Sequence, residues 1–166
     1  MRSEMEVNHA IEEYADMIRR VCFYHLKNRA DCEDIFQEVF LKYMLYDGQF
    51  CDKGHERAWL LRVAINACKD YLKSFFRRNA VSLELINEMQ AQIPEEHKEV
   101  LEAVLSLPPK YKDAIYLHYY EGYSASEIGN ILNKKENTVY SLLSRGRKIL
   151  KDYLLDEKDS PGKAGR

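Results

Sequence analysis

Apolar residues recur at intervals of three and four positions over two long stretches of the chain, residues 8–78 and residues 98–155. This spacing is typical of amphipathic helices, because it gathers the apolar side chains on one face. No stretch alternates apolar and polar residues over the length of a strand, and the 7 glycines and 4 prolines are few for a sheet protein. The pattern predicts an all-α protein with two small helical domains.

The stretch between the two periodic regions differs from both. Residues 80–97 mix apolar and polar residues without a helical period and include Pro94, and residues 80–106 carry six glutamates against one lysine. We therefore expect a flexible acidic linker at 80–97 between domains at 8–79 and 98–155. The polar residues 156–166, which contain a proline and two glycines, predict a disordered tail.

The second domain contains the signature of a helix-turn-helix. The residues from Ser124 to Glu127 have the S-x-x-E form of a capping box, which predicts that a helix begins there. Asn133 and the two lysines after it predict the end of that helix and a tight turn, with a second helix from about Asn137. An upstream helix over 107–120, opened by prolines, is expected to support the pair with its apolar side chains and to bury its aromatic ones. The supporting residues are Ala114, Ile115 and Leu117 or His118.

The second helix of this pair has two different faces. Its apolar face is formed by Val139, Leu142, Leu143, Gly146 and Leu150. Its other side offers an amide, hydroxyls and cations, which suit base edges and phosphates in a major groove. The candidate DNA-binding residues are Asn137, Thr138, Tyr140, Ser141, Ser144, Arg145 and Lys148. The alternative is an ordinary amphipathic hairpin that does not touch DNA.

In the first domain, residues 31–45 predict a helix that exposes leucines. Its buried stripe is expected to consist of Ile35, Phe36, Val39, Phe40 and Tyr43. The opposite face then carries Asp34, Gln37, Glu38, Leu41 and Leu45. Two leucines among acids and an amide predict a surface that binds a protein partner.

A further helix, predicted over 56–78, combines an aromatic residue, an amide and cations on one face. Its apolar face is expected to contain Leu60, Ala64, Ala67, Cys68, Tyr71 and Phe75. Its polar face carries Trp59, Arg62, Asn66, Lys69, Lys73 and Arg77. Such a face suits base stacking and phosphate neutralisation on an opened strand. The alternative is a solvated basic helix with Trp59 folded back against the core.

Other classes of function receive no support from the sequence. The four cysteines form no C-x-x-C pair and no histidine lies at metal-ligand spacing, so we expect reduced, mostly buried thiols and no metal site. There is no glycine-rich phosphate loop and no recognisable nucleophile with its base, so we expect no catalytic residues and no cofactor. The enzymatic alternative is a nuclease that uses Asp31, Glu33 and Asp34, and the same absences argue against it. No apolar stretch approaches a membrane span and the start lacks the layout of a secretory signal, which predicts a cytoplasmic protein without membrane insertion.

The order and spacing of these segments resemble the extracytoplasmic-function (ECF) class of the bacterial sigma-70 family over residues 8–155. The resemblance rests on DCEDIFQEVF at 31–40, AWLLRVAIN at 58–66, DYLK at 70–73, LPP at 107–109, and the EI, TV and RGR pieces at 127–128, 138–139 and 145–147. It implies a non-enzymatic factor that directs RNA polymerase to promoters.

The resemblance also implies partners and residue roles. Asp34, Gln37, Glu38 and Leu41 would bind the beta-prime clamp of core RNA polymerase, and the beta flap of the polymerase is expected as a further contact. The loop 47–55 would capture a flipped base of the minus-ten element, with Trp59, Arg62, Asn66, Lys69 and Lys73 along the neighbouring strand. The helix 137–148 would read the minus-thirty-five element, and the acidic linker would thread the polymerase channel. An anti-sigma factor is expected as a further partner.

The chain departs from the family pattern at two places in the second helix of the pair. Tyr140 and Leu142 stand where basic residues are common, and Asn137 stands where glycine is common. This helix is therefore less cationic than is usual in the family. The alternatives are a conventional helix-turn-helix regulator that binds duplex DNA independently of polymerase, and a structural interaction module.

Overall fold

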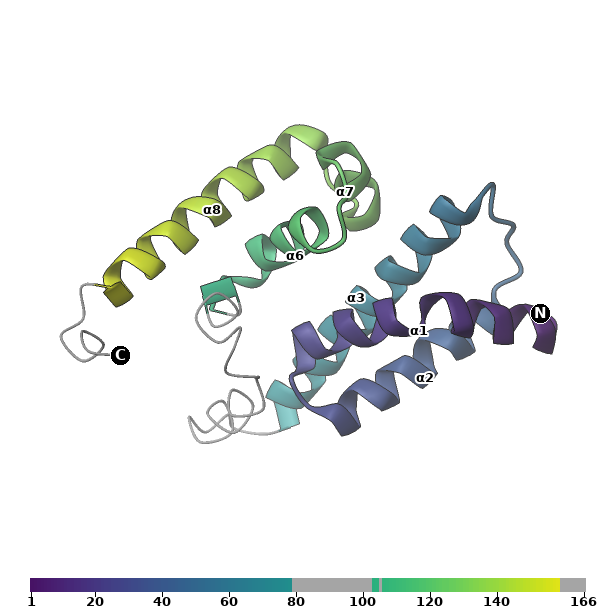
Figure 1. Cartoon of the computed structure of the whole chain (residues 1–166). Helices are drawn as coiled ribbons and strands as arrows, with labels where there is room; N and C mark the ends of the chain where they lie inside the picture. The colour runs from purple at the N-terminus through teal and green to yellow at the C-terminus, as the bar shows by residue number, and fades with distance from the viewer. Residues whose placement is uncertain (79–102, 105, 159–166) are drawn as a thin grey trace. The chain divides into compact units, whose positions relative to one another are not determined.

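The computed structural model describes residues 1–78, 103–104 and 106–158. These residues form two compact units of packed helices, and the described residues contain no strand (Figure 1). The predicted all-α class is therefore confirmed. The predicted linker at 80–97 lies outside the described residues, as does the predicted tail from residue 159 onward.

The first unit is a bundle of three helices, α1 (Glu4–Leu26), α2 (Arg29–Leu45) and α3 (Lys53–Arg78), each of which contacts the other two. α1 and α2 run antiparallel through a two-residue link, and α3 runs back across both (Figure 1). The large aliphatic side chains at the centre are at most 1% exposed, and burying each contributes about 1.5–3 kcal/mol. They are Ile18, Val21, Leu26, Val39, Leu60, Leu61 and Ile65.

Two helices of this unit begin earlier than the periodicity indicates. α1 begins at Glu4 rather than near Asn8, because Ser3 and Glu6 form a capping box in which each side chain accepts a hydrogen bond from the other's backbone amide. α3 begins at Lys53 rather than at Glu56, because the Oδ1 atom of Asp52 accepts a hydrogen bond of 2.7 Å from the amide of His55. The loop expected at 47–55 therefore ends at Asp52.

The second unit contains α6 (Pro109–Tyr119), α7 (Ala125–Leu132) and α8 (Glu136–Lys158). α6 opens with a proline at its first position, as predicted, where the missing amide costs nothing. α8 packs on both α6 and α7. The predicted supporting residues Ala114, Ile115 and Leu117 are each at most 1% exposed, which confirms that α6 underlies the helix pair.

Two expectations for this unit are wrong in part. The aromatic residues of α6 do not all enter the core: Tyr111 and Tyr116 are buried, but Tyr119 and Tyr120 are more than half exposed. They follow the last buried turn of α6, where the chain turns outward toward α7. The last helix also continues to Lys158, so residues 156–158, predicted to belong to a disordered tail, are helical.

Candidate nucleic-acid and protein interfaces

The turn between α7 and α8 has the geometry that its sequence predicts. The Ser124 hydroxyl accepts a hydrogen bond of 3.2 Å from the amide of Glu127, and the Glu127 carboxylate accepts one of 3.2 Å from the amide of Ser124. Asn133 adopts the left-handed conformation with φ 55° and ends α7. The amides of Asn133 and Lys134 both donate to the carbonyl of Gly129. The helix-turn-helix is therefore held by paired backbone groups at both ends of α7.

The first turns of α8 separate core and exposed residues as predicted. Val139, Leu142, Leu143 and Gly146 are buried, and Leu150 is partly buried. Tyr140 is 55% exposed, and its hydroxyl donates a hydrogen bond of 3.4 Å to the carboxylate of Glu136 one turn earlier. All seven candidate DNA-binding residues of this helix are exposed, namely Asn137, Thr138, Tyr140, Ser141, Ser144, Arg145 and Lys148.

An apolar groove of about 530 Å³ lies between α6 and the later turns of α8. Its walls include Ile115 and Leu154, while Arg147 and Lys151 add positive charge. The guanidinium of Arg147 donates a hydrogen bond of 3.0 Å to the hydroxyl of Tyr119, which ties α8 to the end of α6. Sequence reasoning missed this groove, because it placed the aromatic residues of α6 in the core.

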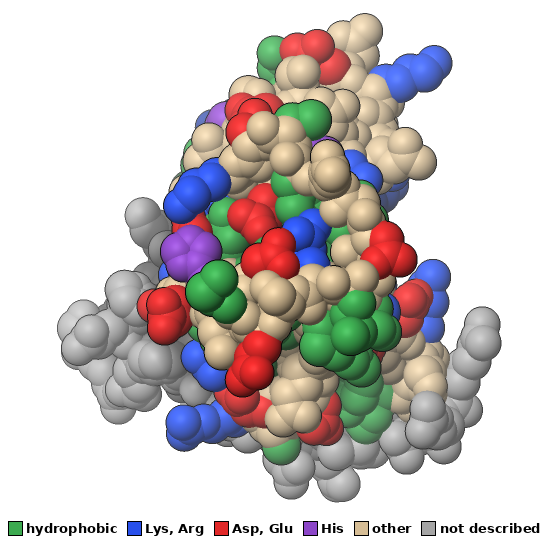
Figure 2. All heavy atoms as spheres, turned by 90° about the vertical axis from the view of Figure 1, so that its right-hand side faces the viewer, with side chains coloured by type: hydrophobic (Ala, Val, Ile, Leu, Met, Phe, Trp, Pro, Cys, Tyr) green, Lys and Arg blue, Asp and Glu red, His purple; other side chains and the backbone are tan. Residues whose placement is uncertain are grey.

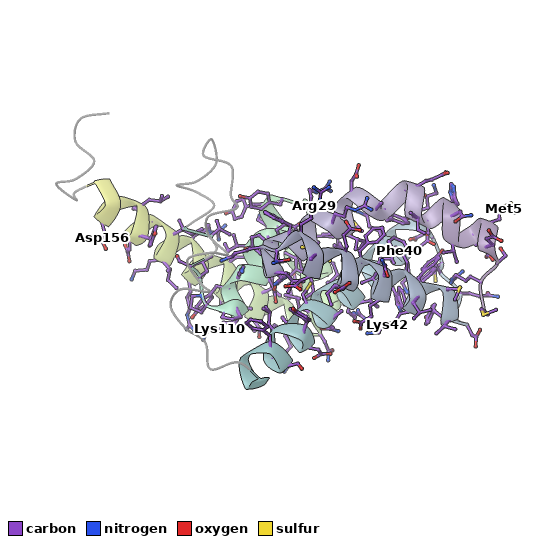
Figure 3. The ribbon with its side chains drawn as sticks, turned by 90° about the horizontal axis from the view of Figure 1, so that it is seen from below. Met5, Arg29, Phe40, Lys42, Lys110 and Asp156 are labelled. Atoms are coloured by element: carbon purple, nitrogen blue, oxygen red, sulfur yellow. The ribbon has the colours of Figure 1, made fainter. Side chains whose placement is uncertain are left out.

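The outer face of α2 carries the two exposed leucines that the sequence predicts. Leu41 is 51% exposed and Leu45 is 55% exposed. The predicted buried stripe is confirmed, since Ile35, Phe36, Val39, Phe40 and Tyr43 each expose less than a tenth of their surface. Figure 3 shows the contrast along this helix, with Phe40 among the packed helices and Lys42 at the outer edge.

The polar residues beside these leucines differ in their exposure and in their hydrogen bonds. Asp34 and Gln37 are exposed, whereas Glu38 accepts a hydrogen bond of 2.7 Å from Lys42 one turn later. This ion pair covers part of the Glu38 side chain, which is half-buried. The face therefore presents leucines flanked by carboxylates and an amide.

On α3, the predicted polar residues form a stripe along the side opposite the core. Arg62, Asn66 and Lys73 are exposed, and Lys69 is partly buried. On the packed side, Leu60, Ala64, Ala67 and Cys68 are buried as predicted, while Tyr71 and Phe75 are only partly buried. The side chain of Arg77 lies outside the described residues. We call Arg62, Asn66, Lys69 and Lys73 the α3 stripe.

Trp59, which precedes the α3 stripe, packs among aromatic rings. Its ring centroid is 4.6 Å from that of Tyr46, 5.7 Å from that of Phe50 and 6.2 Å from that of Tyr43. We call these four residues the aromatic cluster. Trp59 is partly buried, so the structure favours the alternative in which this ring folds back on the protein, with one part of its surface still accessible.

The aromatic cluster is tied to the bundle through Glu56 of α3. The Glu56 carboxylate accepts hydrogen bonds from the hydroxyl of Tyr14 at 3.1 Å and from that of Tyr43 at 2.5 Å. Burial, together with this carboxylate, raises the pKa of both phenols, so each keeps its proton as a donor. One residue of α3 therefore joins α1 and α2 beneath the loop that follows α2.

Arg2 and Phe50 belong to this region and were not anticipated from the sequence. The Arg2 guanidinium lies over the rings of both Tyr43 and Phe50. The close spacing of Tyr43, Tyr46, Phe50 and Trp59 could have signalled an aromatic cluster, whereas nothing in the sequence connects Arg2 to it. Figure 2 looks onto the end of the chain where α1 begins and shows acidic side chains interspersed with hydrophobic ones. The surroundings of the loop are therefore not uniformly basic.

The cysteines, the possible metal ligands and the apolarity of the helices bear on other kinds of function. Cys22, Cys32 and Cys68 are buried free thiols, and Cys51 is exposed. In the part of the chain that the structure describes, no group of three or more His, Cys, Asp or Glu side chains is placed to hold a metal ion. None of the described helices combines the length and apolarity that crossing a membrane requires.

Comparison with known proteins identifies both units. Residues 10–78 match sigma-70 region 2, and residues 97–150 match sigma-70 region 4. The chain is 30% identical over 163 residues to the ECF RNA polymerase sigma factor SigW of Bacillus subtilis, covering 88% of this chain and 87% of that protein. It is 32% identical over 157 residues to the ECF RNA polymerase sigma factor SigE of Mycolicibacterium smegmatis, covering 87% of this chain but only 60% of that protein.

A solved structure agrees at the level of the fold. The sigma factor RpoE, in its complex with the anti-sigma factor NepR from Bartonella quintana, aligns with a TM-score of 0.68 at 16% identity, covering 90% of this chain and 97% of that one. Both sigma-70 regions are thus matched in order, and a relative at 30% identity is covered over most of its length. This chain belongs to the ECF family of sigma-70 RNA polymerase sigma factors.

Proposed function

We propose that this chain is an alternative sigma factor, which binds core RNA polymerase, recognises minus-ten and minus-thirty-five promoter elements and promotes transcription initiation. The observation that carries the proposal is that its two units expose three chemically different surfaces. These are the leucine-bearing face of α2, the α3 stripe and the polar face of α8. A factor that joins polymerase to two promoter elements needs three such surfaces, and it acts by binding rather than by catalysis.

The proposed contact with core polymerase is the outer face of α2, through Asp34, Gln37, Glu38 and Leu41. Leu41 supplies an apolar anchor, while the acids and the amide beside it fix the orientation of the partner. A coiled coil such as that of the beta-prime clamp offers both apolar and charged side chains along one helix face. The proposal therefore assigns the clamp to this face.

The minus-ten element is assigned to α3 and the loop before it. Arg62, Asn66, Lys69 and Lys73 are spaced so that their side chains follow one line along the helix, as a single strand's phosphates require. Trp59 and the aromatic cluster lie at the start of this line, where a ring can stack on an unpaired base. We place the flipped base at the loop after α2, beside Trp59.

The minus-thirty-five element is assigned to α8. Its first turns project an amide, hydroxyls and cations from a helix whose other face is buried. Hydroxyls and amides can bond to base edges, while Arg145 and Lys148 can reach phosphates. Because Tyr140 stands at an exposed position where a cation is common in the family, we expect contacts with this element to depend less on salt than is usual, whereas Leu142 is buried and does not face DNA.

The second unit also carries a surface for protein. An apolar segment of the beta flap in the groove between α6 and α8 would cover the partly exposed Leu150 and Leu154, and Arg147 and Lys151 would meet polar groups at its edge. We also propose an anti-sigma partner, by analogy with the RpoE and NepR complex. Polymerase and promoters both place the site of action in the cytoplasm.

Reconstitution with sigma-free core polymerase tests the proposal. The full chain is mixed with core and with a library of genomic fragments, and run-off transcripts are mapped. We expect initiation at a defined set of start sites that share two upstream elements, and none with core alone. Absence of specific transcripts, together with tight binding of the chain alone to a palindromic duplex site, would instead favour a conventional helix-turn-helix regulator.

A further inference from the structure

The loop between α2 and α3 is held by Arg2, which lies in the segment before α1. The guanidinium of Arg2 donates a hydrogen bond of 2.8 Å from Nη2 to the carbonyl of Gly48, and the backbone amide of Arg2 donates one of 2.8 Å to the carbonyl of Met44. The first of these spans 46 positions of sequence. The segment before α1 is thus attached both to the end of α2 and to the loop.

The same guanidinium lies against aromatic rings of the loop and of α2. Its central carbon is 4.6 Å from the ring centroid of Phe50, 4.7 Å from that of Tyr43 and 5.8 Å from that of Tyr46. The side chain is only 15% exposed, so these cation–π contacts are partly shielded from water and correspondingly stronger. The planar group both stacks and donates, which an ammonium group cannot do equally well.

The loop is also attached by an ion pair between the Met1 amino group and Asp47, and by contacts among aromatic rings, including that of Phe50 with Tyr43 of α2. Phe50 and Tyr46 stack on each other at 5.3 Å, and both rest on Trp59. Gly48 lies beneath the Tyr46 ring, so closely that a Cβ at residue 48 would be 2.2 Å from its Cζ atom. The rings therefore pack on one another, while Arg2 connects that stack to the backbone of the loop.

We infer that Arg2 is a positioning residue for promoter opening, which fixes the loop 46–52 in the conformation that receives an unpaired base of the promoter strand. The inference rests on the proposed function in that it takes this loop as the site of the flipped base. Arg2 itself need not touch DNA. A preformed loop lowers the entropy lost when the base binds, so loosening it slows opening without removing any contact to DNA.

The single tryptophan of the chain reports on this loop without polymerase or DNA. Trp59 contacts Tyr46 and Phe50 directly, so release of the loop exposes its ring. In Arg2→Ala we expect a red shift of the Trp59 emission and stronger quenching by acrylamide than in the unaltered chain, with unchanged helix content by circular dichroism. Arg2→Lys keeps the charge but not the planar group and should give an intermediate result.

Arg19→Ala is the matched control. Arg19 also stacks on an aromatic ring, at 4.3 Å from the centroid of Phe36, and its Nε donates to Glu33, but its contacts join α1 to α2 away from the loop. Its loss should leave the Trp59 emission and promoter opening unchanged. Any difference specific to Arg2→Ala is then due to the loop rather than to the loss of an arginine–aromatic pair.

The functional measurement is the rate of promoter opening by core polymerase bound to each variant, followed by permanganate reactivity of unpaired thymines. We expect Arg2→Ala to open promoters about ten-fold more slowly, as follows from losing a shielded cation–π contact and a charged hydrogen bond, while its affinity for core is unchanged. Unaltered Trp59 emission in Arg2→Ala would overturn the inference, and so would exposure of Trp59 with an unaltered opening rate. If the unaltered chain supports no initiation at all, the proposed function fails instead, and the fluorescence measurement still decides whether Arg2 holds the loop.

Discussion

Gly129 of α7 lies against the backbone of Lys134 in the turn that follows, so closely that a Cβ at residue 129 would be 2.6 Å from the Lys134 carbonyl oxygen. The same turn depends on hydrogen bonds from the amides of Asn133 and Lys134 to the carbonyl of Gly129. The close approach of this turn to α7 therefore requires the absence of a side chain at residue 129.

Replacing this glycine should disturb the unit more than replacing the other glycine in its core. In Gly129→Ala the new methyl group would clash with the backbone carbonyl of Lys134, so the turn must shift. We expect this to lower the free energy of unfolding of the unit by about 1–3 kcal/mol. Gly146→Ala is the comparison, because there the nearest atom belongs to a side chain, Cγ1 of Ile115 at 3.0 Å, and needs to shift by only a few tenths of an ångström. Urea denaturation of the full chain, followed through amide NMR signals of the second unit, measures both. An equal loss of unfolding free energy in Gly129→Ala and Gly146→Ala would show that the contact with the Lys134 carbonyl has no special importance.

Removing the capping box at the start of α7 should lower the stability of the unit by less than Gly129→Ala does. Ser124→Ala removes the acceptor for the amide of Glu127 and should destabilise the unit by about 1 kcal/mol. Ser124→Asp restores an acceptor and should recover most of the loss. Ser126→Ala, at an exposed position of the same helix, is the control and should change stability by less than about 0.5 kcal/mol. The same denaturation experiment separates the three variants, and a loss in Ser126→Ala as large as in Ser124→Ala would count against the capping interpretation.

Sequence patterns predicted these local features because each depends on residues close together in the chain. The S-x-x-E box at Ser124 and the left-handed residue Asn133 act over one helical turn, and the buried stripe of α2 follows from helical periodicity alone. The same S-x-x-E form at Ser3 and Glu6 locates the start of α1, whereas the apolar periodicity indicates a helix only from about Asn8.

Features that depend on distant parts of the chain were not predicted. Periodicity places Trp59 on the polar side of α3 but says nothing of the loop that folds over it. The contact of Arg2 with Gly48 joins positions 46 residues apart, and no local pattern encodes it. The groove beside Tyr119 and Tyr120 was missed for a related reason, since only the packing of α8 on α6 determines which rings of α6 remain exposed.

The α3 stripe leads to a prediction about salt dependence. If Arg62 and Lys73 each neutralise a phosphate of the opened strand, replacing either by alanine should reduce the slope of log affinity against log salt by about 0.7, the value for one single-strand phosphate contact. The measurement is binding of the polymerase complex to a promoter fragment with an unpaired minus-ten region, over a range of potassium chloride concentrations. Arg29→Ala, an exposed cation at the start of α2, is the matched control and should leave the slope unchanged. Slopes that do not respond to Arg62 or Lys73 would remove the phosphate role from this face.

The buried thiol of Cys32 predicts a loss of stability at alkaline pH. Burial, with a smaller contribution from the adjacent Cys22, raises the pKa of Cys32 to about 12. Because the pKa is higher in the folded than in the unfolded chain, the folded state holds the proton more tightly, and the resulting stability is complete below about pH 8.5. It should be lost progressively as the pH rises from there toward 12.

The pKa values of Tyr14 and Tyr43 are also raised, so variants are needed to separate the effect of Cys32 ionisation on stability from that of the tyrosines. The free energy of unfolding, measured with reductant between pH 8 and 10 by Trp59 fluorescence, should fall more steeply in the unaltered chain than in Cys32→Ala. Cys51→Ala alters an exposed thiol and should keep the slope of the unaltered chain. Parallel slopes in the unaltered chain and Cys32→Ala would show that ionisation of Cys32 is not coupled to unfolding.

The exposed leucine face of α2 is proposed to bind core polymerase, so substitutions on this face should lower the affinity of the chain for core. Fluorescently labelled chain is titrated with sigma-free core, and the unaltered chain is compared with Leu41→Lys and with Met5→Lys, which changes an exposed apolar residue of α1 in the same way. We expect tight binding by the unaltered chain and by Met5→Lys, and at least about a thirty-fold weaker complex with Leu41→Lys, as for an anchor residue worth 2 kcal/mol or more. Equal affinities for all three proteins, or no binding of core by the unaltered chain, would contradict the account.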